Sequence, residues 1–118
     1  MFNVLPEVVV DLSCRLGEAP LWHPVEKRLY WLDYPMGRIY RYDPASGGHE
    51  LAFQGARTAG FTFQADGGLL LFMDGPSVAI LQDGKLSYVF EGLPGESGMH
   101  FNDALAYPNG RVFSGTVP

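Results

Sequence analysis

Residues 22–33 read W-H-P-V-E-K-R-L-Y-W-L-D, and residues 63–74 read F-Q-A-D-G-G-L-L-L-F-M-D. The two segments align without a gap, 41 residues apart. A third copy, A-Y-P-N-G-R-V-F-S-G-T, begins at Ala106, which is 43 residues after the start of the second. Repeats of about 40–45 residues are typical of the four-stranded blades of β-propellers. The period therefore predicts a chain built from repeated β-sheet blades.

Strand patterns within each repeat agree with this period. Aromatic and β-branched residues fill short runs, and turn sequences such as Asp83-Gly84 separate them. No segment shows a sustained helical period. We therefore expect an all-β chain of stacked antiparallel sheets, with the first strand of each repeat innermost. The predicted strands cover 19–23, 28–34, 37–42 and 49–53 in the first repeat, 60–64, 68–74, 77–82 and 85–91 in the second, and 103–107 and 111–116 in the third.

The length of 118 residues supplies fewer than three such blades. A closed propeller needs at least about four, so we expect residues 1–118 to be the N-terminal part of a single propeller domain. The blades would lie near 17–55 and 58–92, with an incomplete one at 100–118. Residues 1–13 include a possible strand at Val8–Asp11 that could seal the ring. Remaining blades or other chains would have to complete it.

The composition of the chain restricts its possible binding partners and its cellular compartment. The net charge is −5 and no run of Lys or Arg occurs, which argues against nucleic acid as a partner. No apolar run reaches the roughly 18 residues that a membrane span requires, and Met1–Glu7 lacks the pattern of a signal peptide. The single Cys14 excludes an internal disulfide. We expect a cytoplasmic protein without a membrane partner.

One position of the repeat carries candidate metal ligands. Glu18, Ala59 and Asn102 are equivalent in the alignment, so the carboxylate and the amide should converge on the channel axis. Oxygen ligands that converge in this way are what a hard divalent cation prefers. Two other interpretations stay open, because Glu18 could be a solvated turn carboxylate and Asn102 could belong to an Asx turn.

Residues near this position have less direct interpretations. His100 precedes Asn102 by two residues, so both should share one strand face, and His100 could contact a polar substrate or be merely solvated. Asp103 should point the other way and support the turn. Asp33 and Asp74 are equivalent strand-end residues, for which turn capping is the expected role.

Four motifs follow one another along nearly the whole chain from about residue 13. They are L-G-E-A-P-L-W at 16–22, L-Y-W-L-D at 29–33, G-R-I-Y-R-Y-D-P at 37–44, and F-N-D at 101–103 followed by P-x-G-R-x-x-x-G-T at 108–116. In this order and spacing they resemble the SMP-30/gluconolactonase/LRE-like family. The resemblance implies a six-bladed propeller with one divalent cation in its channel, and an enzyme that acts on sugar lactones.

The same resemblance implies roles for individual residues. Glu18 would be a metal ligand, and Asn102 would touch the metal, its bound water or the substrate. His100 stands where the family often has an Arg that contacts the sugar, which allows a substrate other than gluconolactone. The family's other ligands, an Asn and an Asp that serves the hydrolysis, lie in later blades. No catalytic residue is therefore expected in this chain, and the general base is expected beyond Pro118.

These observations favour the N-terminal part of a metal-dependent lactonase, inactive as 118 residues alone. Calcium is favoured as the metal, although two oxygen ligands do not separate Ca²⁺ from Mg²⁺, Mn²⁺ or Zn²⁺. The alternative is a non-catalytic propeller scaffold that binds a protein or a small ligand, because propellers host many functions. A third interpretation is a short protein whose copies assemble to close a ring.

Overall fold

The computed structural model describes residues 3–118 and is all-β, apart from one short 3₁₀ helix, η1 (Tyr34–Met36). Ten strands form two four-stranded sheets and one two-stranded sheet. Blade 1 contains β1 (Gly17–His23), β2 (Arg28–Asp33), β3 (Arg38–Asp43) and β4 (Gly48–Gln54); blade 2 contains β5 (Thr58–Phe63), β6 (Leu69–Met73), β7 (Ser77–Gln82) and β8 (Lys85–Phe90); the third sheet contains β9 (His100–Ala106) and β10 (Val112–Val117).

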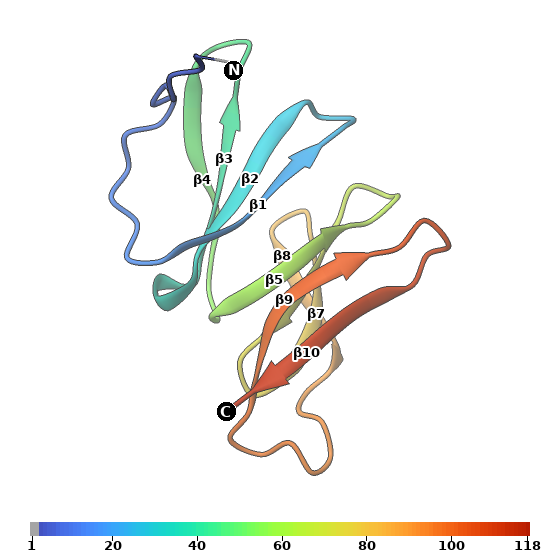
Figure 1. The fold of residues 1–118 in the computed structure, drawn as a ribbon. Helices are drawn as coiled ribbons and strands as arrows, with labels where there is room; N and C mark the ends of the chain where they lie inside the picture. The colour runs from blue at the N-terminus through green and yellow to red at the C-terminus, as the bar shows by residue number, and fades with distance from the viewer. Residues whose placement is uncertain (1–2) are drawn as a thin grey trace.

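Each sheet is an antiparallel meander in which consecutive strands pair. The first strands are neighbours in space, because β5 packs against both β1 and β9 (Figure 1). The all-β fold with four-stranded blades, fewer than three in number, is thus confirmed. Strand β9 begins at His100 rather than at the predicted residue 103, and an isolated antiparallel bridge between Asp74 and His100 ties its start to blade 2.

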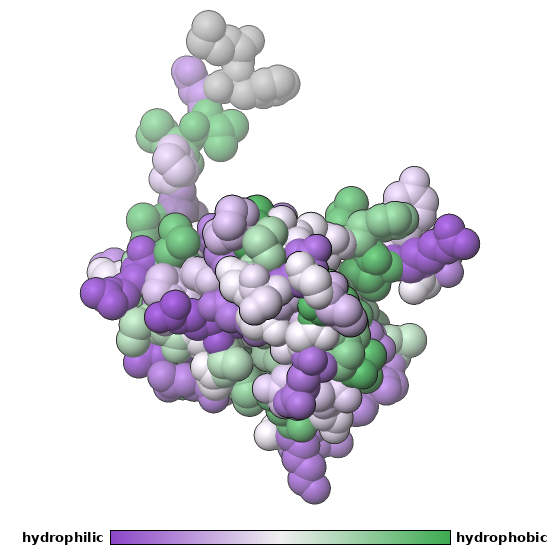
Figure 2. Space-filling view, turned by 90° about the horizontal axis from the view of Figure 1, so that it is seen from below, coloured by the Kyte–Doolittle hydropathy of each residue, from purple (hydrophilic) through white to green (hydrophobic). Residues whose placement is uncertain are grey.

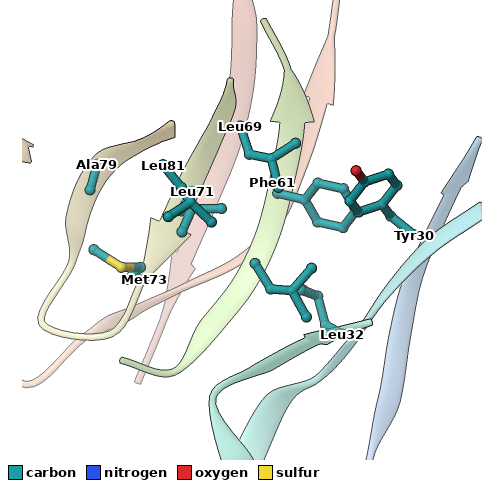
Figure 3. Close-up of a cluster of buried hydrophobic side chains, with 9 residues drawn as sticks. Tyr30, Leu32, Phe61, Leu69, Leu71, Met73, Ala79 and Leu81 are labelled. Carbon is teal, nitrogen blue, oxygen red and sulfur yellow. The ribbon is translucent and has the colours of Figure 1, made fainter. Parts of the chain in front are cut away.

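The main core lies between blades 1 and 2 and within blade 2. Tyr30 and Leu32 of β2 face Phe61 of β5, behind which the side chains of β6 and β7 continue the cluster (Figure 3). Leu71 and Ala79 are completely buried. Burial of a large apolar side chain such as that of Leu71 contributes roughly 1.5–3 kcal/mol, so this shared core fixes the two blades against each other.

The third sheet and the N-terminal segment are less enclosed. Leu105, Tyr107 and Phe113 on β9, β10 and their hairpin are each more than half exposed. The described part of the N-terminal segment stands away from the body of the molecule as an arm (Figure 2), and Val8 is 77% exposed.

The segment predicted to close the ring forms no strand at residues 8–11. Residues 1 and 2, its beginning, lie outside the described residues. A ring-closing strand would pair with a last blade that these 118 residues do not contain, so that role stays a prediction. Among residues 3–118, no helix is long and apolar enough to span a membrane.

Candidate metal and substrate site

Glu18 lies near the start of β1, where the pairing with β2 is irregular. Glu18 pairs with Leu32, but the register then shifts before Leu21. Ala19, between them, has a left-handed backbone with φ 53°, a conformation that is uncommon for residues other than glycine. This bulge bends the first strand next to Glu18, whose side chain is half-buried.

Asn102 lies in the equivalent part of β9, and its surroundings repeat the same irregularity. Asn102 pairs with Gly115, and the register shifts between Gly115 and Phe113. Asp103 has φ 58°. Its carboxylate accepts a hydrogen bond from the Ala104 N–H at 2.7 Å. The Asp103 carbonyl accepts another from the Ser114 hydroxyl at 2.6 Å.

One pocket of about 250 Å³ joins these residues across the three sheets. It is lined by Glu18, Ala19, Ala59, Asn102 and Asp103. The structure therefore brings the two predicted metal ligands to the same pocket, with the small Ala59 between them. Asp103 also lines this pocket. Its left-handed backbone interrupts the strict side-chain alternation of a regular strand, and its bonds to Ala104 and Ser114 agree with the predicted role of supporting the turn.

Gly60 makes this convergence possible. A Cβ atom added at Gly60 would lie 2.5 Å from the carbonyl carbon of Asp103 and 2.6 Å from the Ala104 nitrogen. Only glycine permits so close an approach of two backbones. The absence of a side chain at Gly60 thus sets the spacing between β5 and β9, and with it the position of Asn102 relative to Glu18.

The chemistry of the pocket suits a hard cation. Among the residues that line it are two carboxylates and one amide, whose oxygen atoms are the ligand type of Ca²⁺ and Mg²⁺. Within the described part of the chain, no group of three or more His, Cys, Asp or Glu side chains is arranged to hold a metal ion. The donor types of these residues, carboxylate and amide oxygen, are compatible with such a cation.

His100 begins β9, two residues before Asn102, and is not among the residues that line the pocket. Phe101, its neighbour, is buried against Phe72. His100 and Asn102 therefore share the opposite face of β9, as predicted from their spacing. The His100 ring stacks on Tyr34 of blade 1, with centroids 6.1 Å apart and planes inclined by 28°.

Sequence reasoning missed Tyr34. Its hydroxyl donates to the Asp74 carboxylate, 2.8 Å from Oδ1 and 3.1 Å from Oδ2. Burial, followed by the hydrogen bond and charge of Asp74, raises the pKa of Tyr34 to about 12; the Glu18 charge adds to this and Arg57 opposes it. Tyr34 follows the strand motif 29–33, but no local pattern signals that it reaches another blade.

The two strand-end aspartates have different roles. The Asp33 carboxylate accepts hydrogen bonds from the backbone N–H groups of Arg15 and Leu16, at 3.2 and 3.1 Å, and thereby caps the loop before β1. This agrees with the predicted capping role. Asp74 instead binds the side chain of Tyr34 in the neighbouring blade, so its equivalence to Asp33 in the repeat does not extend to its function.

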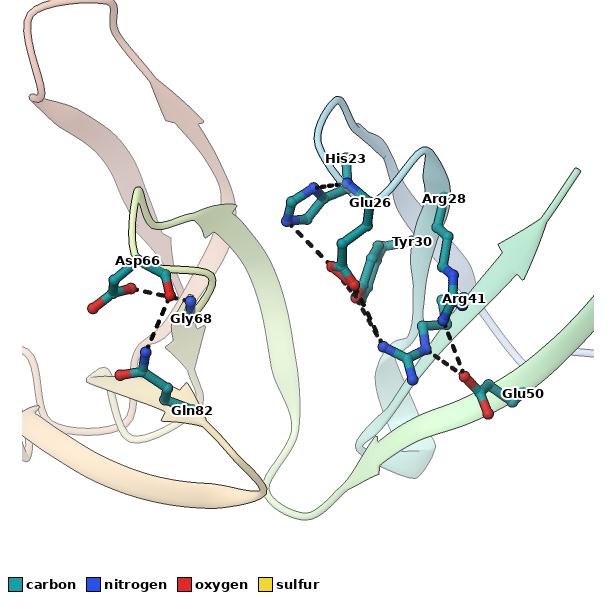
Figure 4. Close-up of polar contacts among 9 residues, drawn as sticks. All are labelled: His23, Glu26, Arg28, Tyr30, Arg41, Glu50, Asp66, Gly68 and Gln82. Carbon is teal, nitrogen blue, oxygen red and sulfur yellow. Dashed lines mark hydrogen bonds and ion pairs between the residues drawn. The ribbon is translucent and has the colours of Figure 1, made fainter. Parts of the chain in front are cut away.

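A second polar cluster lies at the other end of β1 (Figure 4). The Tyr30 hydroxyl donates to the Glu26 carboxylate at 2.8 Å, and the Arg41 guanidinium donates to Tyr30 and to Glu50. His23 accepts the Glu26 N–H at Nδ1, while its Nε2 lies 3.2 Å from Glu26 Oε2 without hydrogen-bond alignment. The pKa of Tyr30 is raised above its ordinary value, mainly by burial of the side chain. These groups bind one another and link strands of blade 1.

Antiparallel four-stranded sheets whose first strands lie side by side have the architecture of β-propeller blades, and a pocket with polar residues lies where these first strands meet. The family described as SMP-30/Gluconolactonase/LRE-like region matches residues 16–118. The chain belongs to this family.

Several known proteins are similar to the chain. Pentonolactonase XacC of Haloferax volcanii is 50% identical over 110 residues, which cover 93% of this chain and 37% of that protein. The 6-deoxy-6-sulfogluconolactonase of Pseudomonas putida is 30% identical, over 98% of this chain and 40% of its own length. Human regucalcin is 25% identical, over 99% and 40%. The chain thus spans about two fifths of the relatives it matches, and two of these three are named as lactonases.

Proposed function

We propose that the chain is the N-terminal part of a metal-dependent lactonase that opens sugar lactones. The observation that carries this proposal is the pocket shared by Glu18, Asn102 and Asp103, in a family whose relatives are named pentonolactonase and 6-deoxy-6-sulfogluconolactonase. In the overall reaction, water adds to the lactone carbonyl carbon and the ring C–O bond breaks, which yields the hydroxy acid.

Glu18 and Asn102 would hold one divalent cation, Asn102 either directly or through a water molecule. Calcium is our first choice because the carboxylate and amide oxygens of the residues that line the pocket are the ligand type it prefers. A bound cation supplies Lewis-acid polarisation of the carbonyl and a more acidic water. Asp103 fixes the bulge through its bonds to Ala104 and Ser114, and its charge adds to the negative potential that favours a cation.

His100, and Asn102 where it is free of the metal, would hydrogen-bond the hydroxyl groups of the lactone. Hydrogen bonds from fixed polar groups orient a substrate for attack. The general base is expected from a later blade beyond Pro118, so the 118 residues alone would be inactive. We propose a cytoplasmic enzyme whose partner is the small lactone, rather than nucleic acid or a membrane.

The test uses the complete propeller, meaning this chain together with the remaining blades that the proposal requires. Hydrolysis of pentono- and hexonolactones is followed after chelation and after return of Ca²⁺, Mg²⁺, Mn²⁺ or Zn²⁺. Activity should vanish on chelation and return with at least one cation. Asn102→Ala should lower kcat/KM at least about tenfold, because loss of even a residue that only supports a metal ligand has an effect of this size.

The matched control is Asn109→Ala, at the turn that follows β9, where the side chain only accepts the Arg111 N–H. This variant should keep nearly full activity. Lactone turnover that is indifferent to chelation would contradict the metal-dependent mechanism. A complete, folded protein without any lactone turnover would instead favour the non-catalytic scaffold.

A further inference from the structure

Three sheets meet at a polar contact that neither the metal ligands nor the reaction accounts for. Tyr34 begins η1, in the connection between β2 and β3 of blade 1; Asp74 follows β6 of blade 2; and His100 begins β9 of the third sheet. Tyr34 contacts both others, through a hydrogen bond to Asp74 and ring stacking on His100. A contact that joins three sheets next to Glu18 and Asn102 can set the geometry of the site.

Asp74 is bound to both Tyr34 and His100. Its two carboxylate oxygens lie 2.8 and 3.1 Å from the Tyr34 hydroxyl, which restricts rotation of the phenol ring. Its backbone forms the antiparallel bridge to His100, and its N–H donates to the Arg57 carbonyl at 3.1 Å. Asp74 thereby locates the His100 backbone and the ring against which the His100 side chain stacks.

The stacked arrangement with Tyr34 is compatible with hydrogen bonding by the two imidazole nitrogens of His100. The Tyr34 and His100 rings are inclined by only 28°, and both imidazole nitrogens form hydrogen bonds in the ring plane. A half-buried histidine without such a neighbour would sample several rotamers, and ordering it on substrate binding would cost about 0.5–1.5 kcal/mol, or roughly a two- to tenfold loss of affinity.

We propose that Tyr34 and Asp74 are positioning residues that hold the His100 imidazole beside the pocket in the orientation that binds a hydroxyl group of the lactone. This inference rests on the proposed function. It adds two positioning residues, one from blade 1 and one from blade 2, to His100 of the third sheet, which is the residue that would touch the sugar. Neither Tyr34 nor Asp74 needs to touch the substrate.

The test is a double-mutant cycle in the complete propeller, with kcat and KM measured for the variants Tyr34→Leu, His100→Ala and the pair. Tyr34→Leu should raise KM about two- to tenfold with kcat nearly unchanged, since the lost order acts on binding. In the His100→Ala background the same change should have no further effect. Independent, multiplicative effects would overturn the proposal, because Tyr34 would then act without His100.

Two further variants separate positioning from folding. Tyr34→Phe keeps the stacked ring and loses only the bond to Asp74, so it should raise KM by less than Tyr34→Leu, about threefold or below. Tyr88→Leu removes a tyrosine that is 47% exposed on the outer strand β8 and should leave KM unchanged. Equal effects of Tyr34→Leu and Tyr88→Leu on KM would contradict the proposal.

An NMR measurement tests the inference independently of catalysis. The ring protons of His100 should be displaced by the ring current of Tyr34 and should move towards ordinary values in Tyr34→Leu, but not in Tyr88→Leu. Unmoved His100 signals would overturn the proposal even if the enzyme is a lactonase. Absence of lactone turnover in the wild-type protein would defeat the proposed function, and the NMR result would still decide whether Tyr34 positions His100.

Discussion

Two residues with left-handed backbones shape the pocket. Ala19 and Asp103 each follow a candidate ligand by one position, and their φ angles are 53° and 58°. Such a backbone costs roughly 1–2 kcal/mol for an ordinary L-residue, although Asp tolerates it better. The repeat alignment predicted that Glu18 and Asn102 would converge. It did not predict that Asp103 lines the same pocket, because a strand pattern assumes regular alternation and contains no information about a bulge.

At the residue scale, the raised pKa of Tyr34 predicts a pH-dependent stability. Tyrosine in the unfolded chain ionises from about pH 10.0, whereas folded Tyr34 keeps its proton until about pH 12. The stabilisation is therefore complete below pH 10 and is lost as the pH rises towards 12. Between these values, the free energy of unfolding should fall more steeply in the wild-type protein than in Tyr34→Phe, as measured by urea denaturation. Parallel pH profiles of the two proteins would show that Tyr34 gains no such stabilisation.

At the element scale, the close approach of two first strands decides the geometry of the site. Gly60 of β5 lies against the backbone of Asp103 and Ala104 in β9, and Ala59 next to it is 4% exposed and lines the pocket. The sequence predicted both strands and their inner location from periodicity. The contact between them could not be predicted, because a glycine in a strand pattern signals a bulge or a close approach without naming the partner.

Gly60→Ala should separate these two strands. The new methyl group would meet Asp103 backbone atoms at 2.5 Å, and such overpacking costs about 1–3 kcal/mol. We expect a lower free energy of unfolding in the complete propeller together with weaker metal binding, since Asn102 would move away from Glu18. The control is Gly48→Ala on β4, where the added Cβ would lie 3.4 Å from the Ser46 hydroxyl. Equal stability and metal affinity in Gly60→Ala and the control would refute this role.

At the scale of the whole molecule, the blades share a core but leave one side open. Tyr30 and Leu32 of blade 1 pack with Phe61 and Leu71 of blade 2, whereas Leu105 of β9 remains 65% exposed. Hydrophobic period and strand order were sufficient to predict the blades, because each repeat encodes its own sheet. The inter-blade contacts that define the site, such as Tyr34 with Asp74, join residues 40 positions apart. The sequence of a single repeat contains no pattern that predicts these contacts between blades.

Glu18 is proposed to hold a divalent cation in the pocket it shares with Asn102. Calorimetric Ca²⁺ titration of the metal-free complete propeller tests it, with Glu18→Gln compared with the wild type and with Glu91→Gln, a change at an exposed carboxylate just after β8. Glu18→Gln preserves the shape of the side chain and removes one negative charge. The affinity for Ca²⁺ should therefore fall at least about tenfold, because loss of even a residue that only supports a metal ligand has an effect of this size. Glu91→Gln should bind as the wild type does. An unchanged affinity in Glu18→Gln, with the wild type binding Ca²⁺, would show that Glu18 is a solvated carboxylate and that the metal site lies elsewhere.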